Sequence, residues 1–206
     1  MTTSNAPCIR YILLRHAQTN TDAAFMNNDT SGLTVENRHE LTFTGKLWCE
    51  NLLDKDGTAL KTFHNFARGS RHRVGAILDV AQPLAFHDGT PAAIATFERL
   101  FLRGATSSTT HHIDIMLSDH MVPTTAKQHI TPVVVVCGST FIDTAFRREF
   151  TTDTIRYAVP LMSVTMYDAF FGEAAEHGGT QWDISFLHCL GNTHLVEGAA
   201  WACNAK

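Results

Sequence analysis

Arg15 and His16 are the adjacent residues whose types best suit chemistry on a phosphate group. They end a mostly apolar run, Ile9–Leu14, which predicts a buried strand. Ligands of open α/β sheets bind at the carboxyl ends of the strands. Arginine supplies fixed donors for phosphate oxygens, and neutral imidazole supplies a nucleophilic nitrogen. The pair therefore indicates phosphoryl transfer through a phosphohistidine; the alternative is a strand end whose polar side chains only face solvent.

The elements that must position this pair alternate between strands and helices. Such alternation predicts a three-layer α/β/α sandwich around a mainly parallel sheet. Polar and turn-forming stretches predict loops at 20–39 and 105–112 and a turn at 87–91. The pattern predicts strands at 9–14, 132–136, 163–167 and 182–190, and helices at 44–53 (with Thr44 as N-cap), 74–80, 91–102 and 141–150.

Size and composition indicate one globular domain. The chain has 206 residues, which favours a single domain over 1–206. Hydrophobic residues make up 44% and charged residues 17%, as in an ordinary folded protein. The net charge of -4 gives no electrostatic reason to expect nucleic acid as a partner. Twelve histidines make the net charge sensitive to mild acid.

Cysteine usage favours a reducing compartment, so we expect a cytoplasmic protein. The odd and scattered set lacks a Cys-x-x-Cys pair, which argues against a zinc ribbon or a disulfide framework. Residues 1–7 lack a basic and then apolar signal, and no apolar run approaches bilayer length, so we expect neither a secretory signal nor a membrane segment. The cysteines are Cys8, Cys49, Cys137, Cys189 and Cys203.

Two segments near the start resemble the histidine phosphatase superfamily, which has the phosphoglycerate-mutase-like fold. Arg15–Thr19 reads Arg-His-Ala-Gln-Thr, beside the family's Arg-His-Gly-x-Thr, and Leu41–Gly45 carries its Leu-Thr-x-x-Gly. The resemblance implies that His16 attacks phosphorus and that Arg15 and Thr19 bind the phosphate. Ala17 replaces the usual glycine. Asp22 replaces a frequent asparagine and would bring negative charge to the pocket if it points inward.

A second phosphate-binding arginine is implied further along. Residues 69–74 read Gly-Ser-Arg-His-Arg-Val where the family has Ser-Ser-x-x-Arg-Ala. This alignment gives the role to Arg73, with Arg68 and Arg71 as competitors. Arginines that begin a helix and only face solvent are the alternative interpretation.

Later segments resemble one branch of the family, the mitochondria-associated, phosphoglycerate-mutase-like protein serine/threonine phosphatases. Residues 87–91 are similar to the branch's Arg-Glu-Gly-x-Pro, and 97–103 and 163–195 also look like it. Asp88 would then stand for the proton-donating carboxylate, with one methylene less reach; a plain turn aspartate is the alternative. The branch implies a mitochondrial membrane anchor, for which this chain has no matching apolar segment.

Gly138 is the main departure from the family. Residues 135–138 read Val-Val-Cys-Gly where the family has Val-Val-Cys-His. That histidine donates to the transferring phosphoryl group, and loss of such a donor costs roughly 10²–10³ in rate. We favour a weak or inactive site whose phosphate pocket, including Gly138 and Ser139, persists. Alternatively, Ser139, His72 or His87 fills the gap, or the glycine leaves room for a bulkier ligand.

Other chemistries fit the sequence less well. A cysteine phosphatase needs Cys-x5-Arg, but the sixth residue after Cys137 is Asp143. Gly-x-Ser-x-Gly and a phosphate-binding glycine-rich loop are missing from the sequence. His111-His112 with Asp114, or His188-Cys189, lack further ligands at metal-site spacing.

The expected function is therefore hydrolysis of a phosphomonoester without a metal or organic cofactor. His16 would attack phosphorus, Arg15 and Arg73 would neutralise the oxygens, Asp88 would protonate the leaving group, and water would cleave the phosphohistidine. The partner would be a phosphorylated small molecule or a phosphoprotein. A non-catalytic phosphate-binding module (a pseudophosphatase) and a scaffold are the alternatives, and a homodimer is left open.

Overall fold

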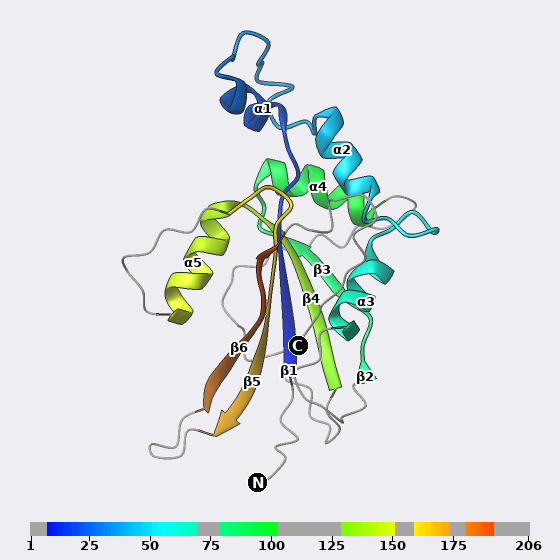
Figure 1. Ribbon diagram of the computed structural model, residues 1–206, viewed down its shortest axis with the longest axis vertical. Helices are drawn as coiled ribbons and strands as arrows, with labels where there is room; N and C mark the ends of the chain where they lie inside the picture. Colours follow the sequence, from blue (N-terminus) through cyan, green and yellow to red (C-terminus); the bar gives the residue numbers. More distant parts are fainter. Residues whose placement is uncertain (1–7, 70–78, 103–128, 151–158, 174–179, 192–206) are drawn as a thin grey trace.

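The computed structural model describes residues 8–69, 79–102, 129–150, 159–173 and 180–191. In these residues a six-stranded sheet is flanked by helices (Figure 1). The strands are β1 (Cys8–Arg15), β2 (Asp79–Val80), β3 (Leu84–His87), β4 (His129–Cys137), β5 (Val164–Glu173) and β6 (Thr180–Gly191). The helices are α1 (Asn20–Asn27), α2 (Phe43–Glu50), α3 (Leu60–Gly69), α4 (Pro91–Phe101) and α5 (Ser139–Phe150).

The sheet is mainly parallel, with one reversed strand. Its order is β2-β4-β1-β5-β6, and β3 also pairs with β4. Strands β1, β2 and β3 all run parallel to β4. Strand β5 is antiparallel to both β1 and β6, so β6 has the same direction as β1. The carboxyl ends of β1, β3 and β4 consequently meet at one edge of the sheet.

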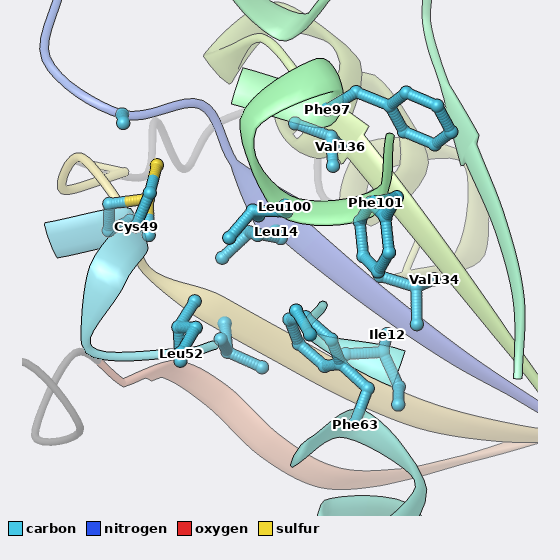
Figure 2. Close-up of a cluster of buried hydrophobic side chains, with 14 of the residues drawn as sticks. Ile12, Leu14, Cys49, Leu52, Phe63, Phe97, Leu100, Phe101, Val134 and Val136 are labelled. Atoms are coloured by element: carbon cyan, nitrogen blue, oxygen red, sulfur yellow. The ribbon is translucent and has the colours of Figure 1, made fainter. Parts of the chain in front are cut away.

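Helices cover both faces of the sheet, which gives the predicted three layers. On one face, Ile12, Leu14, Val134 and Val136 pack with residues of α2, α3 and α4 (Figure 2). On the other, Leu13, Val133 and Val135 pack with Ile142 of α5. Side chains of a strand alternate between faces, so two apolar sets on β1 and β4 require a cover on each side. The α/β/α architecture predicted from the sequence is confirmed.

The central strands follow from their residue types. Val133–Val136 are β-branched and almost fully buried, and β1 beside them is similarly apolar. Parallel strands that are covered on both faces carry nearly continuous apolar runs, which explains why these two strands were predictable. Helices α4 and α5 also lie where the sequence predicted them.

Three local predictions were wrong. The stretch predicted as a loop at 20–39 begins with helix α1, because Thr19 and Asp22 form a capping box. Helix α2 starts after Thr42 rather than Thr44, because the Thr42 hydroxyl accepts from the Gly45 N–H at 2.9 Å. Residues 79–80, predicted as helical, form β2. The remaining predictions at 74–78 and 105–112 lie outside the described residues.

No helix in the described ranges combines the length and apolarity needed to cross a bilayer.

Candidate functional site

His16 lies at the point where β1 leaves the sheet. Its N–H donates to the Cys137 carbonyl at 3.0 Å, which ties it to the end of β4. On the other side, the N–H of Arg15 donates to the Ser163 carbonyl at 3.0 Å. The predicted Arg-His pair is therefore held by the end of β4 and by the residue before β5, at the carboxyl edge of the sheet, which is the edge where open α/β sheets bind ligands.

The imidazole of His16 is buried and oriented by the chain itself. Its Nδ1 lies 2.9 Å from the carbonyl oxygen of Ala17. A carbonyl oxygen only accepts, so Nδ1 is the protonated nitrogen in this arrangement. The lone pair of the neutral ring then resides on Nε2. This is the arrangement that a nucleophilic imidazole requires.

The loop that follows His16 is hydrogen-bonded to helix α4 and to the N-cap of helix α2. The Ala17 N–H donates to the Thr96 hydroxyl of α4 at 2.9 Å. The Gln18 carbonyl accepts from the Thr42 N–H at 3.0 Å, just before α2. A Cβ on Gly45 would stand 2.2 Å from that carbonyl, so only glycine permits this approach. The Leu-Thr-x-x-Gly segment is thus explained by its packing on the His16 loop.

Asp22 does point toward the site. Its Oδ2 lies 3.8 Å from His16 Nδ1. The same oxygen accepts from the Thr19 N–H at 2.8 Å and from the Thr19 hydroxyl at 2.6 Å. The hydroxyl proton of Thr19, a residue predicted to bind phosphate, is therefore directed at Asp22, which adds negative charge beside His16.

Arg15 is partly buried, and its Nε–H group is not used in a hydrogen bond to the described residues. Its guanidinium donates to the Val159 carbonyl through Nη1. Its Nε has no hydrogen-bond partner among the described residues, although that atom is buried. Burial lowers the pKa of Arg15, and the negative charge of Asp22 acts in the opposite direction. A buried guanidinium with an unused donor favours an anion that supplies the missing acceptor.

Asp88 connects the end of β3 to the start of α5. Its Oδ2 accepts from the Gly138 N–H at 2.7 Å. Its Oδ1 accepts from the N–H and hydroxyl of Thr90, at 2.9 and 2.7 Å. All three bonds have the carboxylate as acceptor, and the first places it at the positive end of helix α5.

Among the described residues, the backbone at Gly138, where the resemblance expects a histidine, has room for a side chain. The Asp88 Oδ2 atom, 3.5 Å away, is the neighbour that a Cβ on Gly138 would meet within 4 Å. That is an ordinary van der Waals distance, so the backbone admits a side chain here. Ser139 follows as the first residue of α5 and is half-buried.

His87 belongs to the core more than to the gap beside Gly138. Its ring lies edge-on against Phe97 of α4, with the ring centres 5.1 Å apart. Its Nδ1 accepts from the Gly89 N–H at 3.0 Å. The Nε2 atom is buried without a partner in the described part of the chain. His72, the other candidate replacement, lies outside the described residues.

Of the three candidates for the second phosphate-binding arginine, only Arg68 lies in the described residues. Arg68 is exposed near the end of α3. The neighbouring Ala67 carbonyl accepts from Arg10, which lies in the first half of β1, whereas His16 follows the last residue of that strand. Arg68 therefore belongs to the far end of the sheet and does not join this site. Arg71 and Arg73 lie outside the described residues.

Cys137, at the end of β4, is a buried thiol beside the site. Its Sγ donates to the Leu14 carbonyl at 3.7 Å. Burial raises the pKa of Cys137 well above its ordinary value, and Asp88 adds to that effect while Arg15 opposes it. The protonated thiol is not a nucleophile, which agrees with the lack of a Cys-x5-Arg motif.

Thr96 is a site residue that the sequence pattern did not single out. It lies among the buried residues of α4, where a hydroxyl needs a partner. A polar residue on the apolar stripe of that helix was the available signal.

Groups of three or more metal-binding side chains are not found in the described residues. Of the metal-ligand candidates in the sequence, residues 111–114 lie outside the described residues, and the side chains of His188 and Cys189 are not described.

Known proteins show only a loose structural similarity to this chain. No protein-family model matches the chain, and no curated protein matches it. Among solved structures, it is similar to a phosphoserine phosphatase from Entamoeba histolytica in complex with 3-phosphoglyceric acid. That match covers 91% of this chain and 100% of the other, with 14% identity and a TM-score of 0.44. Such a loose similarity transfers neither fold nor activity to this chain.

Proposed function

We propose that this chain is a weak phosphomonoester hydrolase of the histidine phosphatase type, which works through a phosphohistidine on His16. The observation that carries the proposal is the 2.9 Å contact between His16 Nδ1 and the Ala17 carbonyl. It supports this assignment because it leaves the lone pair on Nε2, the nitrogen that would attack phosphorus. The resemblance of Arg15–Thr19 to the superfamily motif supports the same assignment.

Arg15 is the proposed phosphate-binding cation. Its Nε is buried and lacks a partner among the described residues, so a phosphoryl oxygen would supply the missing acceptor. Arg73 is proposed as the second cation from the resemblance alone. Thr19, Gly138 and Ser139 would complete the pocket, although the Thr19 hydroxyl and the Gly138 N–H already bond to carboxylates.

Low activity follows from two features of this edge. Gly138 supplies no imidazole, so one donor to the transferring phosphoryl group is missing. Asp88, proposed to protonate the leaving group, accepts three hydrogen bonds from protein donors and must release part of this network to act as an acid. Both features slow the transfer without removing the nucleophile.

A non-catalytic phosphate-binding module is the second candidate. It is favoured by the carboxylate of Asp88 at the place beside Gly138, because an acceptor group there cannot replace an imidazole donor. Such a module would use Arg15 and His16 to hold a phosphorylated small molecule or a phosphoprotein.

Hydrolysis of an aryl phosphate separates the two candidates. Wild type, His16→Ala and Gly138→His are compared across mild pH. We expect slow turnover in the wild type, none in His16→Ala, and a gain of roughly 10²-fold in Gly138→His. The matched fold control for both variants is their circular dichroism spectrum. If neither the wild type nor Gly138→His hydrolyses the aryl phosphate but both still bind phosphate, the binding module is favoured. Hydrolysis that persists in His16→Ala would overturn the enzyme proposal.

A further inference from the structure

Thr96 is a fully buried hydroxyl on the face of α4 that packs against the sheet. Its neighbours Ala93, Phe97 and Leu100 are apolar and buried. A threonine in this environment is costly unless its hydroxyl is satisfied. The hydroxyl must therefore find its hydrogen-bond partners inside the core.

The hydroxyl has both of its roles filled. It donates to the Ala92 carbonyl of its own helix at 2.9 Å. It also accepts from the Ala17 N–H, 79 residues earlier in the chain, at 2.9 Å. Because the single proton is directed at Ala92, a lone pair is left to receive the Ala17 N–H. The hydrogen bond from Thr96 to Ala92 thus orients the hydroxyl so that it can accept from the Ala17 N–H.

Ala17 is held at both of its backbone polar groups. Its N–H is bound by Thr96, and its carbonyl accepts from His16 Nδ1 at 2.9 Å. The residue is fully buried, so water cannot substitute easily for either partner. Because both groups flank the same Cα, a displacement of Ala17 that breaks the first bond also moves the carbonyl that determines the imidazole tautomer.

We propose that Thr96 is a positioning residue for His16, which acts through Ala17 to keep the imidazole in the tautomer with Nε2 unprotonated. The catalytic consequence rests on the proposed function, but the tautomer is a property of the folded chain. Asp22 also lies near this ring, with Oδ2 3.8 Å from Nδ1. It is committed to Thr19 through the capping box, so Ala17 has the shorter contact with the ring.

The test removes the Thr96 hydroxyl with a substitution that keeps the shape of the side chain. Thr96→Val deletes the acceptor and leaves a buried Ala17 N–H without a partner, whereas Thr96→Ser keeps the hydroxyl. Thr62→Val is the matched control, because Thr62 is a half-buried threonine in helix α3, away from the His16 loop. The primary readout is the protonation of each His16 ring nitrogen in ¹⁵N-resolved NMR spectra at neutral pH, assigned by comparison with His16→Ala.

We expect Nδ1 of His16 to be protonated in wild type, Thr96→Ser and Thr62→Val, and the two tautomers to mix in Thr96→Val. If the wild type hydrolyses an aryl phosphate, kcat should fall about tenfold or more in Thr96→Val, with KM little changed and with rescue in Thr96→Ser. Should Thr96→Val fail to fold, Thr96→Ala provides the same comparison with less crowding. An unchanged tautomer in a folded hydroxyl-free variant would overturn the proposal, whereas inactivity of the wild type would bear only on the proposed function.

Discussion

Two arginines on strand β1 show how differently one residue type is used at the two ends of the sheet. Arg10 is fully buried and bonds to both carboxylate oxygens of Asp168, through Nε and Nη2, at 2.6 Å each. Arg15, five positions later, is partly buried and has an Nε without a partner in the described residues. A satisfied guanidinium stabilises the fold, whereas an incompletely satisfied one is suited to a ligand.

The surroundings of the two arginines agree with this division. Arg10 joins three elements, because Asp168 lies on β5 and the Ala67 carbonyl, which Nη1 contacts, lies on α3. Arg15 bonds to Val159 and lies next to His16, the proposed nucleophile, opposite Cys137 of β4. We therefore assign a stabilising role to the amino end of β1, and we place the proposed chemistry at its carboxyl end.

The largest expected effect comes from breaking the ion pair of Arg10. Arg10→Leu leaves Asp168 as a buried carboxylate without its counter-ion, so the free energy of unfolding should fall by about 3–5 kcal/mol. Urea titration followed by circular dichroism measures it. The double variant Arg10→Leu, Asp168→Leu should recover part of the loss. Equal losses in Arg10→Leu and Arg15→Leu would show that the two arginines do not differ in this way.

The converse test removes Arg15. Arg15→Met should lower the free energy of unfolding by no more than about 1.5–3 kcal/mol, because one hydrogen bond from a charged donor to the Val159 carbonyl is lost and no buried counter-ion is left behind. The same variant should weaken phosphate or aryl phosphate binding about 10- to 100-fold, since hydrogen bonds to charged groups are worth about 1.5–3 kcal/mol. Calorimetry with inorganic phosphate measures the affinity. Unimpaired binding in a folded Arg15→Met would remove Arg15 from the pocket.

An effect that is expected only at alkaline pH concerns Tyr11, next to Arg10. Burial raises the pKa of Tyr11 to about 12, from an ordinary value of 10.0. The neutral phenol thus stabilises the fold fully below about pH 10, and that contribution is lost as pH rises toward 12. The stability of wild type should fall relative to Tyr11→Phe between these values. Parallel stability curves for the two proteins would show that Tyr11 is not the group responsible.

The sequence predicted the parts of the molecule that depend on apolar pattern. The valines of β4 and the stripe of α4 are local signals, so both elements and the three-layer arrangement were predictable. Helix α1 was missed although its signal was present, because Thr19 and Asp22 have the spacing of a capping box.

The residues of the candidate site were recognisable from the sequence, in the Arg-His motif and at Asp88 and Gly138, but the contacts between them were not. The contact between Asp88 and Gly138 depends on the pairing of β3 with β4, across 50 residues of chain. The bond from Ala17 to Thr96 depends on how α4 packs, which no local spacing encodes. Because these contacts are long-range, the residue types were recognisable from the sequence and their partners were not.

Trapping of the phosphoenzyme tests the central claim most directly. The wild-type protein and His16→Ala are incubated with a reactive aryl phosphate, quenched under alkaline conditions, and mapped by peptide mass spectrometry. We expect an acid-labile phosphoryl group on His16 in the wild type and no label in the variant. Label that persists in folded His16→Ala, or a wild type that hydrolyses the substrate and never carries phosphate on His16, would contradict it.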